Sequence, residues 1–203
     1  MSFKKNKYLV IKKAVPIIIT EFCYHYLLLK REVFYKDDKL RHYGAYGDEI
    51  CKNTYCHYSD VLMETLLVEL LPLMKKKTKL DLVPTYTYCR VYKKGDELKR
   101  HKDRYSCEVS TTLHLGGDKW PIFLEPSGKE GEKGTSILLG QGDMLIYQGC
   151  ELEHWREVFK GENCAQVFLH YNDASKDEAE ENKYDKRPFL GLPAWFKDYK
   201  VHK

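Results

Sequence analysis

Two histidines and one aspartate have the residue types and the spacing of a metal site. His101 and Asp103 are separated by Lys102, and His154 follows much later in the chain. In an extended segment, residues i and i+2 project on the same side, so His101 and Asp103 can reach one ion while Lys102 points away. Two imidazoles and one carboxylate form the facial triad that holds iron(II) and leaves other coordination positions open. The pattern therefore predicts an iron(II) centre.

The segment around the second histidine predicts a basic residue close to this centre. His154 begins a segment that favours a strand, and Arg156, two residues later, projects to the same side of that strand. Arg156 is therefore expected to face the interior, while Trp155 faces outward. A Gly142-Asp143 turn leads into an apolar strand just before His154.

The chain from residue 84 onward is dominated by short strand patterns. Thr, Tyr and Val are frequent in them, and turn residues lie between them. Such a series indicates a sandwich or a barrel. The predicted strands are Thr85 to Lys93, Glu108 to Leu115, Trp120 to Glu125, Thr135 to Leu139, Asp143 to Gln148, His154 to Phe159 and Cys164 to Tyr171.

The N-terminal part is mainly helical in pattern. A strand from Tyr8 to Val15 precedes a helix from Phe22 to Tyr35, and Lys36 to Tyr58 is expected to be a loop. A second helix follows Ser59, the expected N-cap, and Pro72 is expected to kink or split it. Helices followed by grouped strands favour an α+β fold.

Length and composition are typical of one folded domain. The chain has 203 residues, 43% of them hydrophobic and 13% aromatic, and a formal net charge of +4. We expect a single domain with helical support in 1–80, a barrel core in 84–171 and a charged extension in 172–203. Seven cysteines without a C-x-x-C pair, a signal peptide or a membrane span predict a cytoplasmic protein with reduced thiols. Zinc at Cys51, Cys56 and His57 is disfavoured by their spacing.

From about Tyr86 to Tyr171 the chain resembles the iron(II)- and 2-oxoglutarate-dependent dioxygenases of the prolyl-4-hydroxylase-like branch. The matching positions are Arg90-Val91-Tyr92-x-x-Gly95, His101-x-Asp103, Gly142-Asp143 and His154. The resemblance implies a double-stranded β-helix, a jelly-roll or cupin-like barrel with N-terminal supporting helices.

The same resemblance implies a chemistry. His101, Asp103 and His154 would bind Fe(II), and no further catalytic residue is expected beyond these ligands. The cosubstrates would be 2-oxoglutarate and dioxygen, with ascorbate as an optional cofactor. Decarboxylation of the 2-oxo acid would be coupled to hydroxylation of the substrate.

The chain departs from the family pattern where the distal carboxylate of 2-oxoglutarate should bind. Many members place an Arg or Lys about ten residues after the second histidine, but 161–170 contains neither. Arg156 is the first replacement, because a guanidinium suits a buried carboxylate. Arg90 is a second, Gln166 and the Tyr92 hydroxyl are polar partners, and Lys160 is expected to be solvated.

Other functions remain open from the sequence. A cupin-like metal-binding isomerase, or a non-catalytic binding protein, would not need the missing basic residue. The lysines in 75–79 and 93–100 motivate a nucleic-acid role, but no binding motif accompanies them. A protein or small-molecule substrate is favoured over nucleic acid, with no membrane partner. The loops 36–58 and 126–134 and the segment after Asn172 are expected to form a lid.

Overall fold

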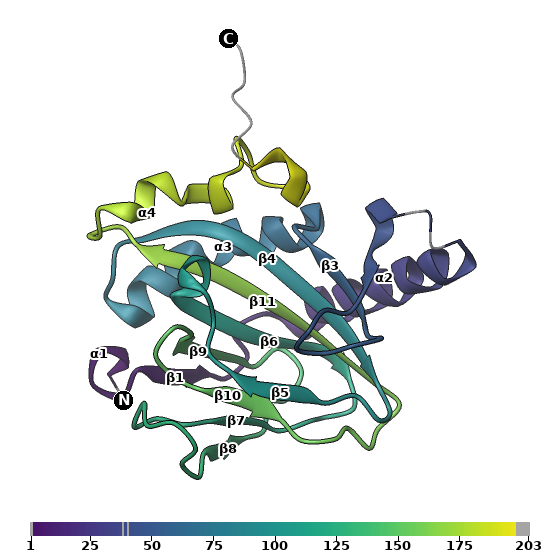
Figure 1. Ribbon diagram of the computed structural model, residues 1–203, viewed down its shortest axis with the longest axis horizontal. Helices are drawn as coiled ribbons and strands as arrows, with labels where there is room; N and C mark the ends of the chain where they lie inside the picture. Colours follow the sequence, from purple (N-terminus) through teal and green to yellow (C-terminus); the bar gives the residue numbers. More distant parts are fainter. Residues whose placement is uncertain (1, 38, 40, 198–203) are drawn as a thin grey trace.

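The fold consists of two antiparallel sheets that face each other, with helices on the outer face of the larger one (Figure 1). The computed structural model describes residues 2–37, 39 and 41–197. The larger sheet has the strand order β1-β9-β6-β11-β4-β3-β2, and the smaller has the order β5-β10-β7-β8. This is the predicted α+β architecture with a double-stranded β-helix core.

The structure has four α-helices and eleven strands in the residues that it describes. The α-helices are α1 (Phe3–Asn6), α2 (Ile17–Lys36), α3 (Val61–Thr78) and α4 (Glu178–Glu181). The larger sheet contains β1 (Tyr8–Ile11), β2 (Ala45–Tyr46), β3 (Tyr55–Tyr58), β4 (Leu82–Lys93), β6 (Val109–Gly117), β9 (Met144–Gln148) and β11 (Asn163–Asp173). The smaller contains β5 (Leu98–His101), β7 (Ile122–Leu124), β8 (Thr135–Ile137) and β10 (His154–Arg156).

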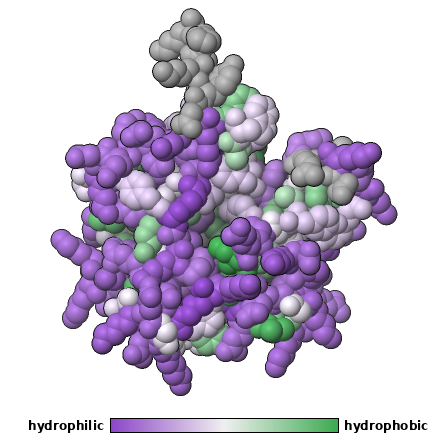
Figure 2. All heavy atoms as spheres, in the orientation of Figure 1, coloured by the Kyte–Doolittle hydropathy of each residue, from purple (hydrophilic) through white to green (hydrophobic). Residues whose placement is uncertain are grey.

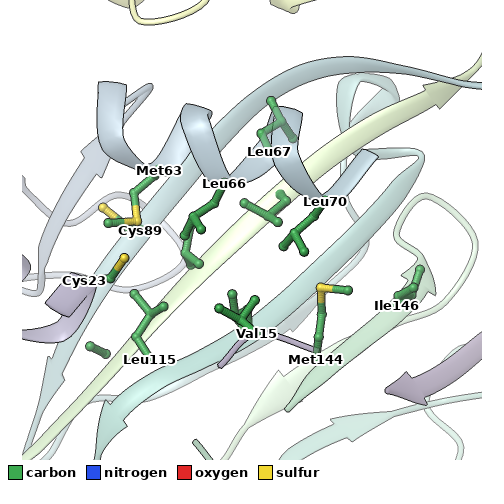
Figure 3. Close-up of a cluster of buried hydrophobic side chains, with 14 of the residues drawn as sticks. Val15, Cys23, Met63, Leu66, Leu67, Leu70, Cys89, Leu115, Met144 and Ile146 are labelled. Carbon is green, nitrogen blue, oxygen red and sulfur yellow. The ribbon is translucent and has the colours of Figure 1, made fainter. Parts of the chain in front are cut away.

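The main hydrophobic core lies between the larger sheet and the helices α2 and α3. Figure 3 shows Met63, Leu66 and Leu70 of α3 pointing toward the strands, and these side chains belong to the same buried cluster as Leu67 and Leu115. Burying such side chains stabilises the fold by roughly 2 kcal/mol each. The larger sheet is therefore packed against helices on one face, and its other face borders the space between the two sheets.

The opposite face of the larger sheet turns its side chains toward the smaller sheet. On β11, Val167 and Leu169 belong to the helix-side core, so Gln166, Phe168 and His170 point into the space between the sheets. The same alternation places Tyr86, Tyr88, Arg90 and Tyr92 of β4 on this inner face. Five of these seven side chains are buried, Tyr88 and Phe168 are partly buried, and several of the seven are polar.

Several elements of the N-terminal part differ from the sequence prediction. The expected loop 36–58 contains β2 and β3, and β3 joins the larger sheet beside β4. The polar composition around Tyr55–Tyr58 conceals a strand only four residues long. The helix α2 also begins earlier than predicted, at Ile17, because the β-branched run 17–19 is a weak helix signal.

The helix α3 is not split at Pro72 but runs from Val61 to Thr78. Pro72 is exposed, so the carbonyl that loses its partner faces water. The N-cap is Asp60 rather than Ser59, and its carboxylate accepts a hydrogen bond from Met63 N at 3.1 Å.

The charged segment after β11 is partly solvated, as its composition predicts, but part of it is buried against the sheets. It crosses the ends of β4 and β11 (Figure 1), and Asn182, Asp185 and Arg187 are buried. Asp185 accepts hydrogen bonds from Arg104 and Tyr58, at 2.7 and 2.6 Å. Asp185 and Arg187 therefore pair within the fold, whereas most other charged side chains of the segment, such as Glu180 and Glu181, are exposed to water.

Hydrophilic side chains cover most of the face seen in Figure 2, and hydrophobic atoms form only small patches. Within the part of the chain that the structure describes, no helix combines the length and apolar character needed to cross a membrane.

Candidate metal centre

The pairing of β5 with β10 brings the three predicted ligands together. His154, the first residue of β10, is the Cα partner of His101, the last residue of β5. Asp103 follows two residues later, and its backbone N–H donates to Gly149 O at 2.9 Å. The ligand atoms of the three side chains lie within 4.8 Å of one another. Residues that are distant in sequence thus form one cluster.

Both imidazoles are held in the tautomer that a metal requires. His101 Nδ1 lies 2.6 Å from the carbonyl oxygen of Lys99, and His154 Nδ1 lies 3.1 Å from that of Leu152. A carbonyl can only accept, so Nδ1 carries the proton in both rings, and Nε2 is the atom left to bind a metal. The two Nε2 atoms lie 3.7 and 3.5 Å from the same oxygen, Asp103 Oδ1.

The charges of the cluster favour an ionised carboxylate. Burial raises the pKa of Asp103, but the charge of His154 and its hydrogen bond outweigh it and hold that pKa well below the usual range. Burial lowers the pKa of His154, but Asp103 outweighs it and raises that pKa. The pKa of His101 is lowered by burial and by the neighbouring His154. A bound cation would replace the proton that His154 and Asp103 attract.

The donor set fits iron(II). Two imidazole nitrogens and one carboxylate oxygen come from one side, and a cavity of about 140 Å³ lies against them. Tyr86, Phe168 and His170 line this cavity from β4 and β11, and Leu98, Ile122 and Tyr147 line it from β5, β7 and β9. A small ligand in this cavity would reach the face of the ion that the protein leaves open.

Arg156 is a buried cation without a carboxylate partner among the described residues. Its side chain is 1% exposed and lies over the Trp120 ring, with 5.1 Å from the guanidinium carbon to the ring centre. One Nη atom donates to Trp120 O and the other to Thr112 Oγ1 at 3.3 Å, but the buried Nε has no acceptor in the described chain. A buried cation of this kind is expensive unless an anion joins it.

Two further predicted residues lie beside Arg156. The Tyr92 hydroxyl is buried without a hydrogen-bond partner in the described chain, and its ring meets Trp120 edge-on, 4.8 Å away. Gln166 accepts from Thr112 Oγ1 at 3.0 Å and donates to His114 Nδ1 at 2.8 Å. Gln166 therefore reaches Arg156 through Thr112. The orphaned Nε and hydroxyl fit a carboxylate such as the distal one of 2-oxoglutarate.

Arg90 differs from Arg156 because its charge already has a partner. It lines the cavity, but it donates to the Asp48 carboxylate and to Cys51 O. Arg156 does not line the cavity itself and is instead the Cα partner of Leu98, which does. Lys160 is exposed on the surface, as expected.

Several residues of the site were not singled out by sequence reasoning. Asp48 lies in the expected loop, and Ser110 and His170 lie within predicted strands to which no ligand role is assigned. His170 has the inward parity of Gln166, which was an available signal. Among the described residues, potential metal ligands come together only around Asp103. His57, considered above for zinc, has its Nδ1 atom 2.8 Å from Lys30 Nζ.

No protein-family model and no curated protein sequence matches the chain. Solved structures do match it, at low identity. A prolyl-4-hydroxylase from Pseudomonas putida is 13% identical, with a TM-score of 0.61 over 84% of this chain and 95% of that one.

Two other matches are an epimerase and a protein with 2-oxoglutarate bound. The non-haem α-ketoglutarate-dependent epimerase SnoN of nogalamycin biosynthesis is 11% identical, with a TM-score of 0.66 over 85% of this chain and 78% of that one. HygX from Streptomyces hygroscopicus, with nickel and 2-oxoglutarate bound, is 13% identical, with a TM-score of 0.59 over 85% of each chain. The chain has the fold of these 2-oxoglutarate- and iron(II)-dependent oxygenases.

Proposed function

We propose that this protein is an iron(II)- and 2-oxoglutarate-dependent dioxygenase that hydroxylates a C–H bond of a protein residue, such as prolyl, or of a small molecule. The observation that carries the proposal is the convergence of two Nε2 atoms on Asp103 Oδ1, with both Nδ1 protons engaged by backbone carbonyls. Such outer hydrogen bonds orient histidine ligands and make them better donors.

Different residues of the chain would bind the metal, bind the cosubstrate and exclude water. His101, Asp103 and His154 would hold the ion, and iron with 2-oxoglutarate would supply the oxidative chemistry. Arg156 would neutralise the distal carboxylate of the cosubstrate, assisted by the Tyr92 hydroxyl. Tyr86 and Phe168 would exclude water from the open side of the ion.

The nature of the substrate is part of the proposal. The matched structures include a hydroxylase and an epimerase, so this fold hosts more than one outcome. We favour hydroxylation because the sequence resemblance is to the prolyl-4-hydroxylase-like branch. Ascorbate would serve to keep the iron reduced.

The proposal is tested by uncoupled turnover. Purified protein with iron(II) in air is expected to convert 2-oxoglutarate slowly to succinate, and His101→Ala and His154→Ala are expected to abolish this. His25→Ala, an exposed histidine on α2, is the matched control. Equal turnover in all four proteins contradicts the proposal. Metal binding without any 2-oxoglutarate turnover would instead support a cupin-like, cosubstrate-free protein.

A further inference from the structure

The two carboxylate oxygens of Asp103 have different surroundings. Oδ1 faces His154 Nε2 at 3.5 Å and His101 Nε2 at 3.7 Å. Oδ2 accepts a hydrogen bond from Ser110 Oγ at 2.8 Å. Only Oδ1 is therefore directed at the position that an ion would occupy between the imidazoles.

Ser110 is placed for this contact by the larger sheet. It lies on β6, is 0% exposed, and points into the space between the sheets. Its Oγ is also 2.8 Å from Cys107 O and 2.9 Å from His170 Nδ1. The hydroxyl has one proton, for which Asp103 Oδ2 and Cys107 O are alternative acceptors, and the ionised carboxylate is the stronger of the two. His170 Nδ1 can donate to the same Oγ, so the serine is held from both sides.

Gly149 leaves the room that this contact needs. A Cβ at position 149 would lie 2.3 Å from Asp103 Oδ2 and 2.8 Å from Ser110 Oγ. The same residue accepts the Asp103 backbone N–H, so it holds the main chain of the aspartate as well. A larger residue at 149 would also meet the Cys107 carbonyl oxygen at 2.4 Å, so it could not be accommodated without displacing the carboxylate or the backbone at 107.

We infer that Ser110 and Gly149 are positioning residues that hold Asp103 as a one-oxygen ligand. The hydrogen bond from Ser110 occupies Oδ2, so the carboxylate contributes Oδ1 alone and does not take a second coordination position. The positions that a chelating cosubstrate and dioxygen need then stay open. This inference rests on the proposed function, because it presupposes a metal at the triad.

The test measures the affinity of the protein for Co(II) alone, by calorimetric titration in the absence of 2-oxoglutarate. Ser110→Ala is expected to weaken Co(II) binding by roughly 10- to 100-fold, as loss of an outer hydrogen bond to a metal ligand usually does. The visible absorption of the bound Co(II) is expected to change too, because the freed Oδ2 can coordinate. Ser110→Thr keeps a hydroxyl and is expected to restore most of the affinity.

Two further variants separate positioning from general damage. Gly149→Ala places a methyl group against both Asp103 Oδ2 and Ser110 Oγ and is expected to weaken Co(II) binding as Ser110→Ala does. Thr111→Val removes a hydroxyl that is equally buried on β6 but accepts from Leu169 N on the helix side. Its Co(II) affinity and spectrum are expected to match those of the unmodified protein.

The outcomes distinguish the inference from the proposed function. If Ser110→Ala binds Co(II) with unchanged affinity and spectrum while His101→Ala loses it, the triad stands and the inference is overturned. It is also overturned if Ser110→Thr is as weak as Ser110→Ala. If the unmodified protein binds no Co(II), both the proposed function and the inference fail.

Discussion

His101 and His154 are direct partners across the antiparallel ladder of β5 and β10, with their ring centres 4.3 Å apart. The separation of two candidate ligands is thus set by one backbone register. Asp103 completes the cluster through its own backbone contact with Gly149, close to the end of the same ladder. The metal site is therefore as rigid as the pairing of these two strands.

The outer face of this ladder carries an aromatic support, and its removal should lower stability. Trp155 stacks on Phe123 with ring centres 5.5 Å apart, and the guanidinium carbon of Arg100 lies 4.0 Å from its ring centre. Trp155→Ala is expected to reduce the free energy of unfolding by about 2 kcal/mol, through lost packing and a lost cation–π contact. Urea unfolding measures this. Trp195→Ala, at a site 74% exposed, is the control and should cost about 0.5 kcal/mol or less.

Arg156 and Arg90 should respond differently to mutation. Arg156→Gln is expected to weaken binding of 2-oxoglutarate to the Co(II)-loaded protein at least about 100-fold, since it removes a buried counter-charge. Arg90→Gln removes a guanidinium already paired with Asp48 and should have a much smaller effect. Calorimetric titration with 2-oxoglutarate measures both affinities. A larger loss of affinity in Arg90→Gln than in Arg156→Gln would mean that Arg90 binds the distal carboxylate of 2-oxoglutarate.

The sequence predicts the parts of this site that depend on local geometry. The parity of His101 with Asp103, and of His154 with Arg156, follows from an extended chain and needs no tertiary information. Ser110 and Gly149 were not predicted, because their role depends on which strands lie side by side. The strand β3 was missed for a related reason, since its pairing with β4 stabilises a segment whose own pattern is weak.

The buried His114 should make stability depend on pH. Burial and the charge of Arg156 lower its pKa from 6.5 to about 4. Between these values the unfolded chain binds a proton that the folded chain does not, so stability is lost as the pH falls from 6.5 toward 4. The loss from this group between pH 7 and 5 is about 2 kcal/mol.

Urea unfolding of the metal-free protein at pH 7 and pH 5 measures this loss. His114→Gln is expected to reduce the difference between the two pH values by that amount. An unchanged difference would mean that the pKa of His114 is the same in the folded and the unfolded chain.

Asp185 should be the residue that attaches the C-terminal segment to the barrel. Burial raises its pKa, but hydrogen bonds from Arg104, Lys197 and Tyr58 outweigh this and lower it. Asp185→Ala is expected to cost about 3 kcal/mol of stability at pH 7, because it breaks a buried ion pair. That contribution is present above pH 3.8, the ordinary pKa, and is lost as the pH falls through the lower folded value.

Denaturant unfolding at pH 7 provides the measurement, with Glu181→Gln as the control. The Glu181 side chain is 78% exposed, and its ion pair with Lys186 is 3.9 Å long, so its removal should change little. Equal stability of the two variants would mean that the segment is held by other contacts.

The central claim, that His101, Asp103 and His154 hold one iron, is tested most directly by anaerobic titration of the metal-free protein with iron(II). We expect one ion per chain, bound by the unmodified protein and by His25→Ala. We expect that site to be lost in His101→Ala, Asp103→Ala and His154→Ala, each of which stays folded by circular dichroism. One equivalent of iron(II) bound with undiminished affinity by all three triad variants would contradict the account.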